Sequence, residues 1–250
     1  MPFDPTQQTT VGSWLQLADP SLTEMMAGAG FDWLCIDLEH TATTIAQAAD
    51  MIRIGDLAGT PMFARLSGHD ASQIKRLLDA GASGIIAPMV NTADEAEAIV
   101  DASFYPPRGS RGVGLARAQG YGTAFEAYRD NEAEAVVVIV QIEHIDAVRN
   151  LEAILAVDGV SGFFVGPYDL SGSLGHPGDF DHPEVRAALA EIETFITPDG
   201  PVAGTHVVDP DVAKLQEALD RGYRFVAFAS EMLIFSNRIS EISTSLAGLR

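Results

Sequence analysis

Apolar runs of strand length alternate with amphipathic stretches of helix length along the whole chain. Each run is followed by a segment in which apolar residues recur with a helical period. Strands that alternate with helices build a parallel sheet, and eight such units match the (β/α)8 barrel. We therefore predict one α/β TIM-barrel domain over residues 1–250. The predicted strands lie near residues 11–18, 33–39, 61–67, 83–90, 135–143, 159–166, 202–207 and 225–229.

Residues that favour helix ends stand at the borders of the helical stretches. Aspartate is a preferred N-cap residue, and glycine accommodates the positive φ at which many helices end. The predicted N-terminal borders are Asp19-Pro20, Asp70, Asp181 and Asp209-Pro210. The predicted stops are Gly30, Gly81 and Gly222.

One connection departs from the regular alternation. Residues 104–123 form a loop rich in glycine, proline and arginine after the fourth strand. Long irregular loops in compact domains commonly carry function, so we predict that this loop is a wall or lid at the barrel rim, facing anionic groups. The alternative is that its arginines pair with carboxylates of the chain itself. These arginines are Arg108, Arg111 and Arg117.

Polar residues are concentrated at the ends of four apolar runs. The carboxyl ends of the strands in a parallel barrel meet at one rim, where barrel enzymes hold their active sites. The residues at these ends therefore predict a single site. They are Asp37, Glu39 and His40, then Arg65, then Gln141, Glu143 and His144, and finally Asp169.

Glu143 and Asp169 are candidate metal ligands. They are 26 residues apart in the chain, about one strand–helix unit of ~30 residues, so we expect them at the ends of adjacent strands. Two carboxylates that leave other coordination positions open suit Mg²⁺, Mn²⁺ or Co²⁺ better than zinc. The alternative is that each carboxylate binds backbone amides or an arginine at the rim.

His40 and Arg65 are candidates for proton transfer and for substrate binding. A neutral imidazole at a strand end could act as a general base, or it could be a hydrogen-bonded rim residue. An arginine that ends an apolar strand needs a partner, either a rim carboxylate or an anionic substrate. His144 and His206 also stand at strand ends, with no pattern that separates catalysis from structure. Asp79, at the end of a helical stretch, looks like a surface residue.

Composition narrows the class of activity. The chain has 35 acidic and 15 basic residues, for a formal net charge of −20 and a pI near 4.4. Such a surface repels phosphate groups, so we expect neither a nucleic acid nor an anionic membrane as a partner. The chain has no run of ~18 apolar residues and no pattern of a secretory leader. We expect a cytoplasmic enzyme that acts on small molecules.

Several reaction classes lose support from the residues that are present. The only lysines, Lys75 and Lys214, lie in helical patterns on the outside of the predicted barrel, whereas Schiff-base chemistry needs an amine inside the site. The sequence contains no P-loop, serine-hydrolase elbow or zinc-protease motif. The single cysteine, Cys35, lies in an apolar run and is expected in the core. Metal-assisted acid/base chemistry is the reaction class that the residues still support.

The chain resembles the HpcH/HpaI aldolases, the 4-hydroxy-2-oxo-heptanedioate aldolase group of metal-dependent pyruvate aldolases. The resemblance covers nearly the whole length, and its ordered set of motifs is highly specific. The motifs are AGAGFDWLCIDLEH, ARLSGHDASQIKRLLDAGASGIIAPMV, YPPRGSRGVGLARA, VQIEHIDAVRNLEAIL and GVSGFFVGPYDLS.

The resemblance implies a role for each matching position. It makes Glu143 and Asp169 the ligands of a divalent metal ion. It makes His40 the catalytic histidine and Arg65 the arginine that polarises the substrate. Asp79, against its surface character, becomes the partner of His40. The substrate-binding positions are Gln141 beside the metal and Gly166, Pro167 and Tyr168 in the GPYD segment, where a tyrosine replaces the small residue common in relatives.

The resemblance also implies an activity and an assembly. The activity is reversible cleavage of a 4-hydroxy-2-oxo acid to an aldehyde and pyruvate, or a close analogue such as hydroxypyruvate. The assembly is a homohexamer, a trimer of dimers, with the last helix packed on a neighbouring subunit. Two alternatives stay open: a citrate-lyase-like enzyme acting on acyl-CoA, and a non-catalytic protein that binds 2-oxo acids.

Overall fold

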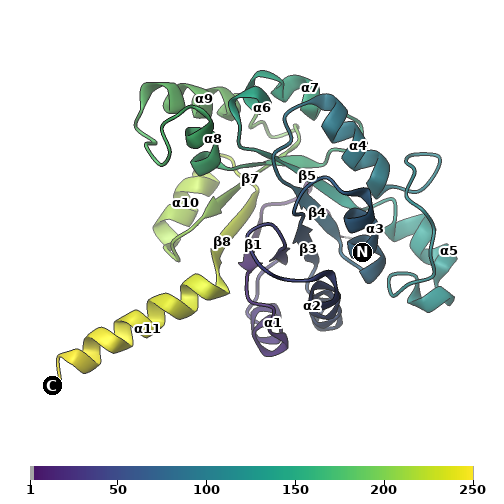
Figure 1. Ribbon diagram of the computed structural model, residues 1–250, viewed down its shortest axis with the longest axis horizontal. Helices are drawn as coiled ribbons and strands as arrows, with labels where there is room; N and C mark the ends of the chain where they lie inside the picture. The colour runs from purple at the N-terminus through teal and green to yellow at the C-terminus, as the bar shows by residue number, and fades with distance from the viewer. Residues whose placement is uncertain (1–2, 250) are drawn as a thin grey trace.

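The computed structural model, which describes residues 3–249, is a closed barrel of eight parallel strands arranged in sequence order. All eight predicted strands are present, most of them shorter than the apolar runs, and the predicted TIM barrel is confirmed (Figure 1). The strands are β1 Thr10–Leu15, β2 Trp33–Asp37, β3 Met62–Arg65, β4 Gly84–Ala87, β5 Val137–Ile142, β6 Gly162–Val165, β7 Val202–Val207 and β8 Phe225–Ser230.

Helices follow the strands and cover the outside of the barrel (Figure 1). The longer ones are α1 Pro20–Ala27, α2 Ile45–Ala58, α3 Ala71–Ala80, α4 Ala93–Ser103, α9 Pro183–Glu193, α10 Val212–Asp220 and α11 Glu231–Ala247. The shorter ones are α5 Phe125–Ala127, α6 Ile145–Arg149, α7 Leu151–Leu155 and α8 Pro167–Ser173, with the single turns η1 Gly120–Gly122 and η2 Tyr128–Glu132.

The structure confirms some of the predicted helix borders and shifts others. Asp19 and Asp70 are N-caps whose side chains accept backbone N–H groups of the first turn, and Gly81 ends α3 in the left-handed conformation. Two N-caps lie later in the chain than predicted: α9 is capped by His182 and α10 by Asp211. For α9 the reason is Pro183, whose fixed φ suits the first helical position.

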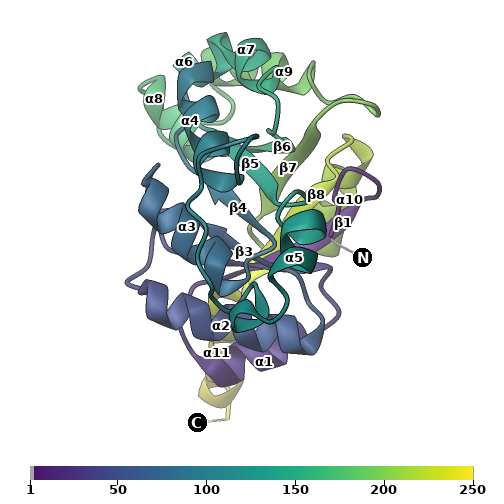
Figure 2. The same ribbon diagram turned by 90° about the vertical axis from the view of Figure 1, so that its right-hand side faces the viewer.

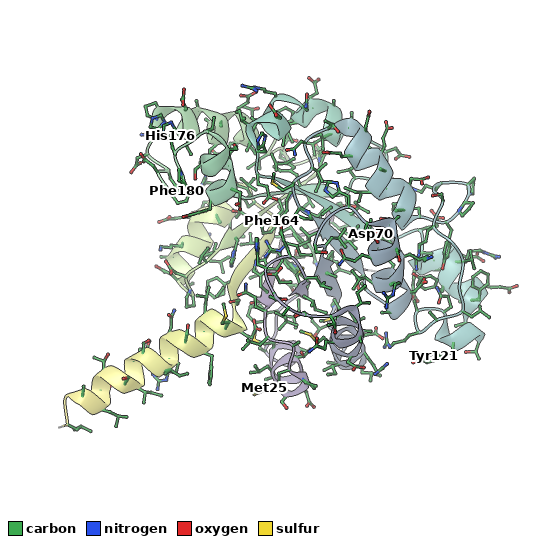
Figure 3. The ribbon with its side chains drawn as sticks, in the orientation of Figure 1. Met25, Asp70, Tyr121, Phe164, His176 and Phe180 are labelled. Atoms are coloured by element: carbon green, nitrogen blue, oxygen red, sulfur yellow. The ribbon has the colours of Figure 1, made fainter. Side chains whose placement is uncertain are left out.

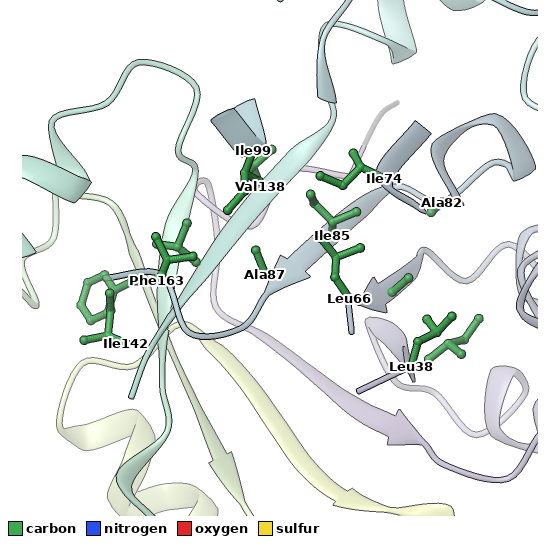
Figure 4. Packing of buried hydrophobic residues seen from close by; sticks show 14 of the residues in the cluster. Leu38, Leu66, Ile74, Ala82, Ile85, Ala87, Ile99, Val138, Ile142 and Phe163 are labelled. Atoms are coloured by element: carbon green, nitrogen blue, oxygen red, sulfur yellow. The ribbon is translucent and has the colours of Figure 1, made fainter. Parts of the chain in front are cut away.

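Two layers of apolar side chains form the core. Inside the barrel, Trp33 stacks on Phe225 with ring centroids 4.0 Å apart, and Cys35 is buried among the same side chains, as predicted. Outside the strands, a second layer lies beneath the helices, where Val138 of β5 lies close to Ile99 of α4 (Figure 4). The filled interior makes this barrel a rigid support for the residues at its strand ends.

The loop of residues 104–123 does not lie at the rim that carries the strand ends. It follows α4, which runs back along the barrel, so the loop begins at the opposite face; α4 and α5 lie on the side that Figure 2 turns toward the viewer. Arg111 Nη2 lies 2.7 Å from Asp79 Oδ1. Arg108 and Arg117 also pair with carboxylates. The loop is therefore not a lid over the strand ends of its own chain, and these arginines hold it to the chain's own acidic groups.

The last helix, α11, leaves the barrel and extends away from it (Figures 1 and 2). Its buried residue is Glu231 at the N-terminal end. Among the helices of the described part of the chain, none combines the length and the apolar character that a membrane crossing needs.

Candidate active site

Inward-facing rows of side chains change from apolar to polar at the carboxyl ends of the strands. Alternate residues of a strand face the same side, so the row of Trp33 and Cys35 in β2 continues to Asp37. The row of Phe63 in β3 continues in the same way to Arg65. In β5 the corresponding row runs from Ile139 to Gln141 and Glu143. The barrel itself therefore places these polar groups at one end.

Asp37 is the centre of a hydrogen-bond network at the end of β2. Its Oδ1 accepts from Arg65 Nε at 3.0 Å, and its Oδ2 accepts from Arg65 Nη2 at 2.7 Å. Oδ1 also accepts the backbone N–H groups of Glu39 and His40 at 3.0 and 3.2 Å. Burial would raise the pKa of the Asp37 carboxyl, but the Arg65 guanidinium outweighs burial and holds this pKa below its usual value. An ionised Asp37 thus fixes both Arg65 and the turn that carries His40.

Arg65 touches two further side chains. Its Nε lies 3.4 Å from Glu39 Oε2, and its guanidinium lies over the ring of Trp14, 4.4 Å from the ring centroid. Trp14, on β1, was not among the predicted site residues, because an apolar strand residue has no signal that distinguishes a pocket wall from core. Of the two alternatives left open for Arg65, the structure shows the pairing with rim carboxylates.

Glu143 is a buried carboxylate directly after β5, with 4% of its surface exposed. Its Oε1 accepts the backbone N–H of Met89 at 2.7 Å, and its Oε2 accepts from Gln141 Nε2 at 2.8 Å. Burial raises the pKa of Glu143 to about 7. The hydrogen bond from the Met89 N–H lowers this pKa, whereas the charges of Glu39 and Asp169 raise it further. A carboxylate in this state is stabilised when a cation binds beside it.

Asp169 lies in the first turn of α8, directly after β6, and is exposed. Its charge raises the pKa of both Glu39 and Glu143, which shows that the three carboxylates share one electrostatic environment. Gly166 makes this approach possible, because a Cβ at this position would lie 2.6 Å from Glu143 Oε2. Next to it, Tyr168 is exposed on α8.

The donor set fits a hard divalent cation. The Oε1 atom of Gln141 is buried without a hydrogen-bond partner, and the Oε2 atom of Glu39 has ion-pair contacts to Arg65 and His40 but no hydrogen bond. Unsatisfied buried oxygens are rare in folded proteins, and a nearby cation would compensate for them and for the repulsion among the carboxylates of Glu39, Glu143 and Asp169. Oxygen donors of this kind suit Mg²⁺, Mn²⁺ or Co²⁺.

The structure brings His40 to this end of the barrel but leaves Asp79 at the other end. The His40 side chain is 58% exposed, and its Nε2 lies 3.6 Å from Glu39 Oε2. Asp79 is in the last turn of α3, close to the amino end of β4, where it pairs with Arg111. An Asp79–His40 pair is therefore not formed within one chain, because α3 carries Asp79 to the face opposite the strand ends.

Met89, which the sequence did not single out, and His206, which it left open, also lie at the site. Met89, after β4, has a positive φ of 52°, a conformation that costs energy for a residue with a side chain, and it thereby directs its N–H at Glu143. His206 had been left undecided. Its ring lies edge-on to Trp14, and burial lowers its pKa to about 4, so the ring is neutral. The strain at Met89 could not be found from sequence, because it is a property of the backbone.

A cavity of about 1190 Å³ lies away from this site. It is bounded by the amino-terminal segment, the end of α2 and the segment after residue 117, all at the face opposite the strand ends. Its lining lacks the polar strand-end residues, so we assign the chemistry to the strand ends.

Comparisons with known proteins agree with this geometry. Residues 10–237 match the HpcH/HpaI aldolase/citrate lyase family. The chain is 39% identical to the hydroxypyruvate/pyruvate aldolase of Cupriavidus necator, over 96% of this chain and 88% of that protein. It is also 39% identical to the 4-hydroxy-2-oxovalerate aldolase of Rhodococcus jostii, over 96% of this chain and 92% of that protein.

Solved structures lead to the same family. The crystal structure of an HpcH/HpaI aldolase/citrate lyase family protein from Burkholderia cenocepacia superimposes with a TM-score of 0.88 at 32% identity, covering 96% of this chain and 95% of that one. The resemblance inferred from the motifs is thus confirmed over the barrel. The chain belongs to the HpcH/HpaI aldolase/citrate lyase family.

Proposed function

We propose that this protein is a metal-dependent aldolase. It cleaves a 4-hydroxy-2-oxo acid reversibly to an aldehyde and pyruvate or hydroxypyruvate. The observation that carries this proposal is the buried carboxylate of Glu143, which shares an electrostatic environment with Asp169 and Arg65 at one end of the barrel. The aldolase names of the relatives support carbon–carbon cleavage over acyl-CoA chemistry and over binding alone.

Glu143 and Asp169 would hold the metal ion, which is Mg²⁺, Mn²⁺ or Co²⁺. When bound, the ion supplies positive charge that stabilises the enolate left by cleavage. Gln141 donates from Nε2 to Glu143 Oε2 and keeps a buried Oε1 without a hydrogen-bond partner. Gly166, Pro167 and Tyr168 form the neighbouring wall, where the absence of a side chain at Gly166 keeps space beside Glu143.

Arg65 and His40 perform the remaining steps. The Arg65 guanidinium, held in place by Asp37, adds positive charge where the substrate oxygen becomes negative. His40 accepts the proton of the 4-hydroxyl as the C3–C4 bond breaks, and a proton returned to C3 of the enolate gives pyruvate; synthesis reverses both transfers. Glu39, within 3.6 Å of the His40 ring and 3.4 Å of Arg65, orients both groups.

We propose that the active form is a homo-oligomer, a hexamer arranged as a trimer of dimers. The support is α11, which extends from the barrel with large apolar side chains exposed. Asp79 lies at the face opposite its own His40, so in this arrangement it can pair only with His40 of another subunit.

The function is tested by measuring pyruvate release from a 4-hydroxy-2-oxo acid in the presence of Mg²⁺, Mn²⁺ or Co²⁺, and then after chelation. We expect chelation to abolish release and one of the ions to restore it. Glu143→Gln, which keeps the shape of the side chain, should lose at least about a hundredfold in kcat/KM, or ~3 kcal/mol. Full activity in chelator, or in Glu143→Gln, would refute the metal-dependent mechanism.

A further inference from the structure

A second group of metal-ligating side chains lies outside the strand-end site. His176, His182 and Glu184 each offer one ligand atom, and these atoms all lie within 4.8 Å of one another. His176 is in the connection between α8 and α9, His182 caps α9, and Glu184 is in its first turn. Figure 3 shows His176 at the outer edge of the molecule, apart from Phe164 at the centre of the barrel.

We propose that His176, His182 and Glu184 bind a second divalent cation of the zinc class. Two imidazoles and one carboxylate favour borderline ions such as Zn²⁺ over Mg²⁺, which prefers oxygen ligands. Three protein ligands leave a fourth position of a tetrahedral zinc ion to water. The site therefore differs in ligand chemistry from the oxygen-rich site of Glu143 and Asp169.

The three side chains already contact one another without an ion. Nε2 of His176 lies 3.2 Å from Oε2 of Glu184, and the two imidazole rings stack with centroids 3.4 Å apart. Nδ1 of His182 accepts the Glu184 backbone N–H at 3.4 Å, which leaves the second ring nitrogen for a ligand. A metal ion binds in the plane of an imidazole, so binding needs one ring to turn out of the stack. The terminal torsion of histidine is soft, so a ring can turn about it.

The backbone of the connection holds the histidines together. The Ser171 carbonyl accepts the His176 N–H at 2.9 Å, and the Ser171 hydroxyl accepts the Gly178 N–H at 2.8 Å. Pro183 at the first position of α9 restricts the backbone beside His182. A loop that is already ordered loses less conformational entropy on binding an ion.

A bound ion would stabilise the connection between α8 and α9, which packs on Tyr168 next to the strand-end site. Phe180, in the same connection, makes an edge-to-face contact with Tyr168, with ring centroids 6.5 Å apart. Tyr168 precedes the proposed ligand Asp169 on α8. Occupation of the histidine site should therefore reduce opening of residues 174–182 without contributing a reacting group.

The test is titration of the intact protein with Zn²⁺ in a large excess of Mg²⁺, with calorimetry and metal analysis of the dialysed protein. We expect wild type to hold one more Zn²⁺ per chain than His176→Gln or His182→Asn, or to bind it at least about tenfold more tightly. Asn retains a side-chain oxygen that can cap α9, so His182→Asn separates ligation from helix capping. Glu184→Gln should weaken binding, whereas Glu191→Gln, the same change on the exposed face of the same helix, should not.

A second measurement does not depend on stoichiometry. Zn²⁺ should slow hydrogen exchange in residues 174–182 of wild type and of Glu191→Gln, but not of His182→Asn. Equal Zn²⁺ binding and equal protection in wild type, His176→Gln and His182→Asn would overturn the proposal, and so would a wild type that binds no Zn²⁺ in the presence of Mg²⁺. Neither measurement requires turnover, so the outcome is independent of the proposed aldolase activity.

Discussion

Arg65 and Asp37 face each other in register on adjacent strands and form a bidentate ion pair, with nitrogen–oxygen distances of 3.0 and 2.7 Å. The Asp37 side chain is fully buried and the Arg65 side chain is 13% exposed. A two-point contact fixes the plane of the guanidinium as well as its position. The direction in which Arg65 presents its charge is therefore set by the pairing of β2 with β3.

Replacing Asp37 should cost both stability and activity. Asp37→Asn keeps the size of the side chain but leaves the Arg65 charge without its partner in a dry environment. We expect a loss of about 3 kcal/mol in the free energy of unfolding, as for other broken buried pairs, together with a lower kcat. Urea unfolding and steady-state kinetics measure the two effects.

The matched control is Asp50→Asn. Asp50 pairs with Arg53 at 2.6 Å on the exposed surface of α2, where such pairs contribute less than about 1 kcal/mol. Equal losses in the two variants would mean that burial adds nothing to the Arg65–Asp37 pair and would contradict the role given to Asp37.

Gly166 should tolerate no side chain, because of its contact with Glu143. A Cβ at this position would lie 2.6 Å from Oε2 and 2.8 Å from Cβ of Glu143. Gly166→Ala should therefore displace the carboxylate, weaken metal binding at least about tenfold and cost about 1–3 kcal/mol of stability. Titration with Mn²⁺ and thermal unfolding report on the two quantities.

Gly172, in the α8 helix that Gly166 caps, provides the comparison. A Cβ there has no neighbour within 4 Å, and alanine is favoured over glycine in a helix by about 0.5–1 kcal/mol. Gly172→Ala should thus leave metal binding unchanged and raise stability slightly. If both alanine variants bind Mn²⁺ like wild type, the close approach of Gly166 has no functional meaning.

The barrel could be predicted from the sequence because its strands are long apolar runs separated by clear helix signals. The polar strand ends could be predicted for the same reason, since Asp37, Arg65 and Glu143 interrupt apolar rows at the point where each strand stops. The pattern of apolar and polar residues along the chain thus predicted both the fold and the main residues of the site.

Other features depend on information that the pattern does not contain. Loop 104–123 was assigned to the wrong face because its composition resembled that of a catalytic loop, whereas chain direction after α4 decides its place. Chain direction also explains why Asp79 does not meet His40 of its own chain. The α3 helix starts at the strand-end rim, so Asp79 in its last turn lies at the opposite face. The role of Met89 rests on a positive φ, which no local sequence signal demands of a methionine.

His206 should make stability fall as the solution becomes acidic. Burial lowers its pKa from the ordinary 6.5 to about 4, and the Arg65 charge acts in the same direction. Between these values the unfolded chain binds a proton that the folded protein does not. The contribution of His206 to stability is thus complete above pH 6.5 and is lost as pH falls toward 4, by about 3 kcal/mol in total.

His206→Gln removes the titrating group and should flatten this dependence. The measurement is the free energy of unfolding by urea between pH 7 and pH 4, in chelator, for wild type and variant. Other groups titrate in both proteins, so the difference between the two curves is the relevant quantity. Parallel curves would show that the imidazole accepts a proton equally well in the folded and unfolded states.

The exposed stripe on α11 predicts an interface. Phe235, Ile239, Ile242 and Leu246 recur at intervals of four, three and four residues, which places them on one face of the helix, and each is 46–59% exposed. Burying a large apolar side chain contributes about 1.5–3 kcal/mol, so a helix that projects from the barrel gains stability by packing on a second copy of the chain.

Phe235→Ser combined with Ile242→Ser should lower the mass measured by sedimentation at micromolar concentration. Leu57→Ser, which removes an apolar side chain 78% exposed on α2, should leave that mass unchanged. A wild type that sediments as a monomer, or a double variant with the mass of wild type, would show that the stripe does not hold the subunits together.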